Sequence, residues 1–129
     1  MAKGLLLAAA LILLLATGLG AYASHGLDPM LGAEARAAVQ TAIQYQFYHG
    51  LAVIAAAILG DRHERAASLW VAGTLFVAGT LLFCGSIYAA RLGGVDVMGG
   101  LAPVGGVCLM AGWAAFGLGV SRLRVRSGR

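Results

Sequence analysis

Hydrophobic residues fall into four long runs that short polar segments separate. The runs cover about residues 4–24, 41–60, 69–90 and 100–120. A helix rises about 1.5 Å per residue, so roughly 20 apolar residues cross the hydrocarbon core of a bilayer. Lipid offers no partners to free backbone groups, so each run is predicted to be a complete helix. The pattern therefore predicts an all-α membrane protein, an antiparallel up-down four-helix transmembrane bundle in a single domain over residues 1–129.

The polar segments supply the connections. Residues 61–65 form a short charged turn between the second and third spans, and residues 91–99 form a Gly-rich loop between the third and fourth. Asp28-Pro29 has the pattern of a helix cap followed by proline at the first helical position. A short helix from Met30 into Gln40 is therefore predicted to lie at the membrane interface between spans one and two.

Composition agrees with this membrane class. Of the 129 residues, 60% are hydrophobic and 11% are charged, and the mean hydropathy is +0.87. A soluble domain has about 45–50% apolar and about 25% charged residues. The 20 glycines fit a membrane bundle, in which small residues let helix backbones approach closely.

The basic residues indicate a direction. With the amino terminus inside, the cytoplasmic side holds Lys3, Arg62, Arg65, Arg122, Arg124, Arg126 and Arg129. Only Arg36 and Arg91 then lie outside, which is the positive-inside pattern. Both termini are therefore predicted to be cytoplasmic, in the plasma (inner) membrane. The Arg-rich tail that contributes to the net charge of +4 is interpreted as an anchor on anionic lipid, and no nucleic-acid partner is predicted.

One alternative concerns the first span. Lys3, the Leu-rich run and Ala21-Tyr22-Ala23 before Ser24 also resemble a secretory signal with an A-x-A cleavage site. Cleavage would leave three spans in the same direction. The apolar run is longer than most signal sequences have, which favours an uncleaved helix.

Polar and aromatic residues gather toward the outer ends of the spans. His49 would lie about 12 Å below the start of span two, a depth at which imidazole must be neutral and hydrogen-bonded. A structural network, a small-molecule or lipid-headgroup site, and a metal or haem site remain as alternatives. The candidate ligand-binding or structural cluster comprises Tyr22, His25, Gln44, Tyr45, Tyr48, His49, Ser86, Tyr88, Pro103 and Gly105.

Several other functional classes require residues that this chain lacks. The hydrocarbon parts of the four spans contain no Asp, Glu, Lys or Arg, which disfavours ion-coupled pumps and proton relays. No G-x-S-x-G or H-E-x-x-H motif is present, so the chain is not expected to be an enzyme; an intramembrane Ser86–His49 dyad is the remote alternative. Of the alternatives at His49, the metal or haem site is the least favoured, so the leading interpretation includes no metal site and no cofactor. Cys84 and Cys108 are expected to be buried thiols, with a disulfide between them left open.

Pairs of small residues are spaced for close helix contact, either within the bundle or in a homo-oligomer. These pairs are Ala16 with Gly20, Gly85 with Ala89, and Ala115 with Gly119.

Four segments resemble one known family: residues 20–27 (GAYASHGL), 41–52 (TAIQYQFYHGLA), 79–88 (GTLLFCGSIY) and 102–106 (APVGG), the last followed by Gly112-Trp113. The family is that of the small inner-membrane proteins of unknown function typified by bacterial YgdD and related to mitochondrial transmembrane protein 256, domain-of-unknown-function family 423. The resemblance implies a four-helix inner-membrane protein with an uncleaved amino terminus, and it implies no activity. It favours a site at the polar cluster, on which the signature residues fall.

The leading functional hypothesis is a non-enzymatic accessory or scaffold protein. It would bind a partner membrane protein or a lipid through the outer polar cluster. The alternative is a binder or transporter of a small neutral solute, acting alone or as an oligomer. The inner halves of the spans are aliphatic, which disfavours a pore within one subunit.

Overall fold

Four long helices form the molecule. The computed structural model describes residues 1–25, 31–63 and 67–123. The helices are α1 (Ala2–His25), α2 (Ala33–Arg62), α3 (Ala67–Arg91) and α4 (Ala102–Ser121), and a 3₁₀ helix, η1 (Asp96–Leu101), precedes α4. Helices α1, α2 and α3 and the continuous segment Asp96–Ser121, which joins η1 to α4, are each long and apolar enough to cross a membrane. The predicted all-α four-helix bundle is confirmed.

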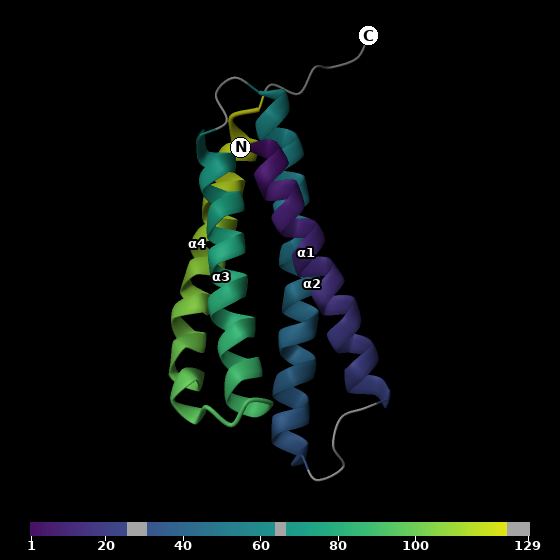
Figure 1. Ribbon diagram of the computed structural model, residues 1–129. Coiled ribbons are helices and arrows are strands. Elements are labelled where there is room, and N and C mark those ends of the chain that lie inside the picture. Colours follow the sequence, from purple (N-terminus) through teal and green to yellow (C-terminus); the bar gives the residue numbers. More distant parts are fainter. Residues whose placement is uncertain (26–30, 64–66, 124–129) are drawn as a thin grey trace.

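The helices alternate in direction, so that the start of α1 and the end of α4 lie at the same end of the bundle (Figure 1). This terminal end holds the start of α1 at Ala2 and the end of α4 at Ser121. The distal end holds the end of α1 at His25 and the start of α2 at Ala33.

The separate interfacial helix predicted before span two is wrong. Helix α2 runs without a break from Ala33 to Arg62, and residues 33–40 are its first turns. These residues include no Gly or Pro and are mostly strong helix formers, so nothing interrupts the helix. With 30 residues, α2 is about 45 Å long, which exceeds the hydrocarbon thickness of roughly 30 Å. The predicted start of that helix, at residues 28–30, lies outside the described residues.

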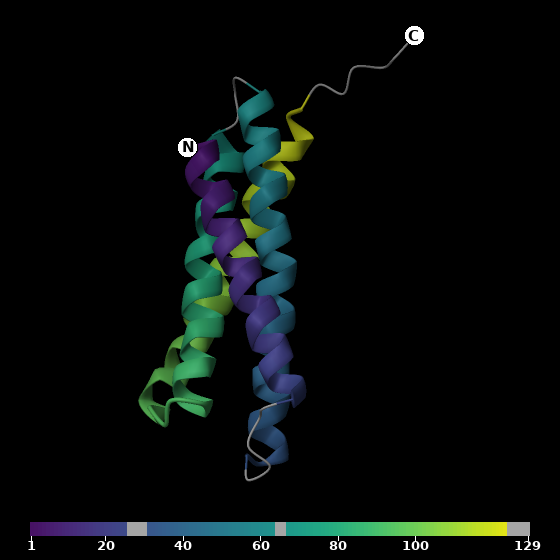
Figure 2. The ribbon, with the colours of Figure 1, turned by 45° about the vertical axis from the view of Figure 1, so that its right-hand side comes forward.

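Helices that follow one another in the chain pack side by side. Helix α2 packs against α1 and α3, α3 packs against α4, and α1 touches α3 only lightly. Figures 1 and 2 show that α3 and α4 diverge from α1 and α2 toward the distal end. At that end the Arg91 guanidinium lies 3.4 Å from the Glu34 carboxylate. Both side chains are exposed, so this ion pair contributes little.

A row of glycines closes the contact between α3 and α4. Gly105, Gly112 and Gly119 recur every seven residues on one face of α4, and together they are the glycine seam. Gly105 lies against the backbone of Phe83, and Gly119 lies against Leu69. A Cβ atom added at Gly112 would stand 2.8 Å from the Phe76 ring. The glycines therefore let the two backbones approach closely.

The predicted small-residue pairs have different roles. Ala16 is fully buried, whereas a Cβ at Gly20 would meet only Ile43, at 3.8 Å. Gly119 belongs to the glycine seam. A Cβ at Gly85 would meet no atom within 4 Å, so this glycine is not a close-packing position.

Candidate functional site

The buried polar groups form two hydrogen-bonded clusters near the middle of the bundle. The first centres on Gln46 of α2, which is only 5% exposed. Its Nε2 donates to the backbone oxygen of Ile12 at 2.9 Å, and its Oε1 accepts from the Tyr88 hydroxyl at 2.7 Å. One amide side chain therefore joins α1, α2 and α3.

The second cluster centres on His49, which is also 5% exposed. Its Nδ1 lies 2.7 Å from the backbone oxygen of Tyr45, and its Nε2 lies 3.2 Å from Nε1 of Trp113. A carbonyl can only accept and an indole N–H can only donate, so Nδ1 carries the proton and Nε2 accepts. His49 is therefore a neutral imidazole with both nitrogens engaged, and it joins α2 to α4.

Aromatic rings surround His49. The ring centroids of Tyr45, Phe76 and Trp113 lie 5.5, 5.7 and 6.1 Å from that of His49. Tyr45 in turn stacks on Phe83, with centroids 4.9 Å apart. Tilted and stacked pairs at such distances are favourable aromatic arrangements.

The rings of Tyr45, His49, Phe83 and Trp113 form the wall of a groove between α2 and α4, with a volume of about 560 Å³. Tyr48, Met110 and Trp113 at its rim are exposed on the outer surface of the bundle, so this α2–α4 groove opens sideways, toward lipid. The lining residues are Tyr45, Tyr48, His49, Phe83, Gly106, Leu109, Met110 and Trp113.

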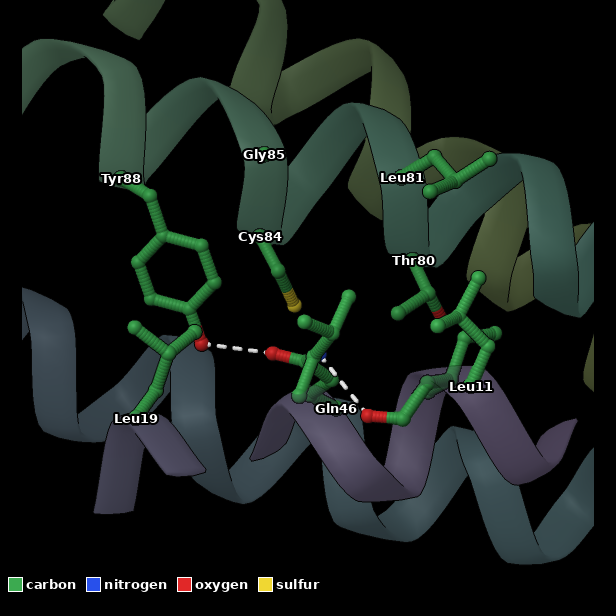
Figure 3. Close-up of a pocket in the computed structure, with 10 residues that line it drawn as sticks. Leu11, Leu19, Gln46, Thr80, Leu81, Cys84, Gly85 and Tyr88 are labelled. Atoms are coloured by element: carbon green, nitrogen blue, oxygen red, sulfur yellow. Dashed lines mark hydrogen bonds between the residues drawn. The ribbon is translucent and has the colours of Figure 1, made fainter. Parts of the chain in front are cut away.

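A second, smaller hollow lies on the other side of α3. This α1–α3 cavity has a volume of about 160 Å³ and lies among leucines of α1 and α3 (Figure 3). Gln46, Thr80, Cys84 and Tyr88 supply its polar atoms. The first hydrogen-bonded cluster thus borders the cavity, and the second borders the groove.

Comparison with known proteins identifies the family of this chain. A family model described as a protein of unknown function, DUF423, matches residues 19–106. The chain belongs to this family. The membrane protein YwdK of Bacillus subtilis is 34% identical over 100 residues, which cover 78% of this chain and 81% of YwdK. The inner membrane protein YgdD of Escherichia coli is 35% identical over 108 residues, with 82% and 80% covered.

A third relative, a membrane protein of Staphylococcus saprophyticus, is 32% identical over 121 residues, which cover 94% of this chain and 99% of the relative. All three carry the name UPF0382, and none of the three names states an activity. No solved structure matches the chain. The resemblance to the DUF423 family is confirmed, and the chain is an integral membrane protein of a family without an assigned function.

Three of the predicted cluster residues come together in this DUF423 protein. Tyr45, Tyr48 and His49 all line the α2–α4 groove. Tyr88 joins Gln46 instead, beside the α1–α3 cavity. Gly105 faces neither hollow, because it lies in the glycine seam.

The predicted convergence of His25 with His49 is wrong. His25 is exposed at the last residue of α1. Ile12, which marks the level of Gln46, precedes His25 by more than three turns, roughly 20 Å along the axis. His49 is one turn beyond Gln46, so the two imidazoles cannot ligate one haem or metal. Among the described residues, no group of three His, Cys, Asp or Glu side chains is placed to hold a metal ion.

Two further residues of the predicted cluster lie away from both the groove and the cavity. Tyr22 is exposed on α1. Gln44 is exposed on α2 and lines a shallow depression near the distal end together with Ser24 and Gln40. The predicted cluster is therefore not one site at the outer membrane surface.

The remote Ser86–His49 dyad is not formed. The Ser86 hydroxyl donates to the backbone oxygen of Phe83 at 2.9 Å. Ser86 also lies almost three turns beyond Phe76, the α3 residue next to the His49 ring, which is roughly 15 Å along the axis. Pro103 lies in the first turn of α4, where proline loses no helical hydrogen bond.

The two cysteines are free thiols, so the disulfide alternative does not hold. Cys84 is buried, and its Sγ donates to the backbone oxygen of Ala42 at 3.2 Å. It therefore behaves as a small core residue with one weak hydrogen bond to α2.

Gln46, Thr80 and Trp113 are the residues that the sequence interpretation left out of the cluster. Gln46 precedes His49 by three residues and so shares its face of α2, a signal that was present in the spacing. Trp113 lies at the middle of its span, where no polar neighbour in the sequence draws attention to it. Only the packing of α4 brings its indole N–H to His49.

Proposed function

We propose that this DUF423 protein is a non-enzymatic membrane protein that binds a lipid chain in the α2–α4 groove. The observation that carries the proposal is a preformed aromatic groove at mid-membrane depth that opens sideways to lipid. Its volume of about 560 Å³ lies within the range of roughly 300–1,000 Å³ that is typical of small-molecule sites. A partner helix, about 10 Å across and spanning the bilayer, is far larger than this hollow.

The chemistry of the groove favours an apolar occupant. His49 and Trp113 use their ring N–H and N atoms on each other and on Tyr45, so they present ring surfaces to a ligand. The exposed Tyr48 hydroxyl at the rim is available to a polar group at the end of an apolar chain. Because both His49 nitrogens are engaged, the imidazole has no lone pair free to act as a general base, which supports a binding role over catalysis.

Conduction of a neutral solute finds less support. Among the described residues, the buried polar side chains are Gln46, His49, Thr80 and Ser86, in the middle or the distal half of their spans. Toward the terminal end the described residues that are fully buried are apolar: Ala9, Val53, Ala56, Ala57, Leu69 and Ala72. A polar path does not continue through this layer, so the groove is better suited to holding a molecule than to passing one.

We also propose that the terminal end faces the cytoplasm. Lys3, Arg62 and Arg122 lie at that end, against Arg36 and Arg91 at the distal end. A membrane-impermeant thiol reagent applied to spheroplasts should then label a Val97→Cys variant and spare Ser121→Cys. Labelling of Ser121→Cys alone would show that the protein has the opposite orientation.

The groove itself is tested by filling it. Gly106 lines the groove, and an added Cβ would meet only the Phe83 ring, at 4.0 Å, so Gly106→Leu occupies the hollow without a backbone clash. Gly117→Leu is the matched control, because a Cβ at Gly117 would meet no atom within 4 Å. Native mass spectrometry of protein released gently from membranes should show bound lipid reduced severalfold in Gly106→Leu and unchanged in Gly117→Leu. Equal lipid retention in the two variants would refute the proposal.

A histidine pair gives an independent comparison. His49→Leu removes the acceptor that fixes Trp113, whereas His63→Leu changes a residue just beyond α2 at the terminal end. We expect His49→Leu to lose bound lipid and His63→Leu to keep it, with both remaining monodisperse and helical. If both variants copurify with identical lipids and partners, the groove has no binding role. If His49→Leu instead loses a copurifying protein and keeps its lipid, the groove is a partner-binding surface and the lipid proposal is wrong.

A further inference from the structure

The α1–α3 cavity contains a polar group without a partner. Thr80 is 2% exposed, and its Oγ1 is buried with no hydrogen bond to any described residue. Thr17, Thr41 and Thr74 each donate to the carbonyl four residues earlier, at 2.8, 3.0 and 2.9 Å. That bond is the usual way for a helical threonine to satisfy its hydroxyl. Thr80 instead turns its hydroxyl away from its own helix and toward α1 and α2 (Figure 3).

The other polar atoms around the cavity are already engaged. Gln46 uses its Nε2 on Ile12 and its Oε1 on Tyr88, and Cys84 donates to Ala42. Each of these side chains already has a partner, whereas the Thr80 hydroxyl has none among the described residues, and a hydroxyl can both donate and accept. The rest of the lining is largely aliphatic, including Leu11, Ile12, Leu15, Leu19 and Leu81. Such a cavity selects an uncharged, mainly apolar molecule with one hydrogen-bonding oxygen.

The volume of the cavity and its opening to lipid limit the class of ligand further. The cavity measures about 160 Å³, and an apolar protein cavity of about 150 Å³ is known to hold benzene. Leu11, Leu15 and Leu81 line the cavity and are exposed on the outer surface, so it opens to lipid between α1 and α3. Gly85 lies beside them with open space where a side chain would be. A ring fits inside, and an alkyl tail on that ring would extend into the bilayer.

We infer that the α1–α3 cavity is a second binding site, separate from the α2–α4 groove. It takes a single-ring lipophile whose hydroxyl or carbonyl oxygen bonds Thr80 Oγ1. The ligand is either a small free molecule of this kind or the ring of a tailed lipophile, since both present the same chemistry to Thr80. The molecule enters from the bilayer and not from water.

The test uses a phenol that carries a photoreactive diazirine, with the full chain reconstituted in lipid nanodiscs. Mass spectrometry of the labelled protein should map the adduct to the cavity lining, at Leu15 and Leu81. Thr80→Val keeps the shape of the side chain and removes the hydroxyl, and labelling should fall about fivefold or more, as expected for one lost hydrogen bond. Thr74→Val, the same change on the same helix, should label like the parent chain. Equal labelling of the two variants would overturn the site, as would adducts spread evenly over all lipid-facing surfaces.

Competition defines the ligand. Both 4-methylphenol and 4-dodecylphenol should displace the probe, and methylbenzene, which lacks the oxygen, should do so much more weakly. Displacement by the short phenol at concentrations similar to the long one assigns the site to free small molecules. A strong preference for the long phenol assigns it to the ring of a tailed lipophile. If methylbenzene competes as well as 4-methylphenol, Thr80 recognises nothing and the proposal fails.

A second variant separates binding from folding. Gly85→Leu places a side chain in the cavity opening, where an added Cβ meets no atom within 4 Å, and it leaves Thr80 in place. This variant should lose labelling while retaining its helicity and thermal stability. Gly106→Leu, which fills the α2–α4 groove, should label normally, so the two sites succeed or fail independently. Full labelling of Gly85→Leu would contradict entry between α1 and α3.

Discussion

The two sides of α3 differ sharply in how they meet their neighbours. Toward α4, the glycine seam brings the two backbones together, with Gly105 directly against the backbone of Phe83. Toward α1, α3 makes only light contact and borders a cavity of about 160 Å³. Since lipid tails are as apolar as leucine, packing rather than the hydrophobic effect holds membrane helices together. The seam therefore provides stability, and the looser side leaves room for a ligand.

Glycine has opposite roles on the two sides. A Cβ at Gly105 would overlap backbone atoms of α3, whereas a Cβ at Gly85 would meet no atom within 4 Å. Both are helical glycines in apolar spans. The neighbouring helix, and not the residue type, decides whether a glycine is structural.

The largest change in stability is expected from a substitution in the glycine seam. Gly105→Ala forces α4 away from Phe83, and because backbone atoms cannot rotate aside, we expect a loss of about 3 kcal/mol in the free energy of unfolding. Gly85→Ala is the control, with stability unchanged or raised by up to about 1 kcal/mol through helix propensity. Unfolding in mixed micelles of detergent and sodium dodecyl sulfate, followed by circular dichroism, measures both. Equal stability of the two variants would mean that the seam is not tightly packed.

The spans were predictable from the sequence because they depend on length and hydrophobicity alone. The first three predicted runs lie within α1, α2 and α3, and the fourth begins in the last residues of η1 and continues through α4. The first turns of α2 are not predictable in the same way, because a charged, Ala-rich segment is equally compatible with an interfacial helix and with the extension of a long one. The helix continues there because no residue after Gly32 stops it.

The site was less predictable, because helix spacing tells which residues share a face but not which face is inside. Gln44 and Gln46 are two residues apart, and only the second is buried. The depth of His49 in its span predicts that it needs partners, but the pattern does not reveal that Tyr45 and the distant Trp113 provide them. Thr80 gave no signal in the sequence, because its missing hydrogen bond is visible only in three dimensions.

An intermediate effect is expected where Gln46 joins three helices. Gln46→Leu leaves the Tyr88 hydroxyl without its acceptor and removes the bond to Ile12, so we expect a loss of about 1–2 kcal/mol. Gln44→Leu, on the exposed side of the same helix, should change stability by less than about 0.5 kcal/mol. In a double-mutant cycle, Tyr88→Phe should cost less in the Gln46→Leu background than in the parent chain. Strict additivity would show that the 2.7 Å bond between these side chains has no energetic role.

The smallest effect has the opposite sign and concerns the loose side of α3. The buried Thr80 hydroxyl has no partner in the part of the chain that the structure describes. Thr80→Val therefore removes an unsatisfied polar group and should raise the free energy of unfolding by about 1 kcal/mol. Thr74→Val gives up a bond to the Trp70 carbonyl at an exposed position and should be neutral or slightly destabilising. Thermal unfolding of the two variants in the same detergent, without added ligand, measures the difference. If Thr80→Val is more stable, the threonine lowers the stability of the fold, as expected of a residue that is kept in the cavity wall to bind a ligand. If Thr80→Val is less stable, the hydroxyl contributes to the fold instead.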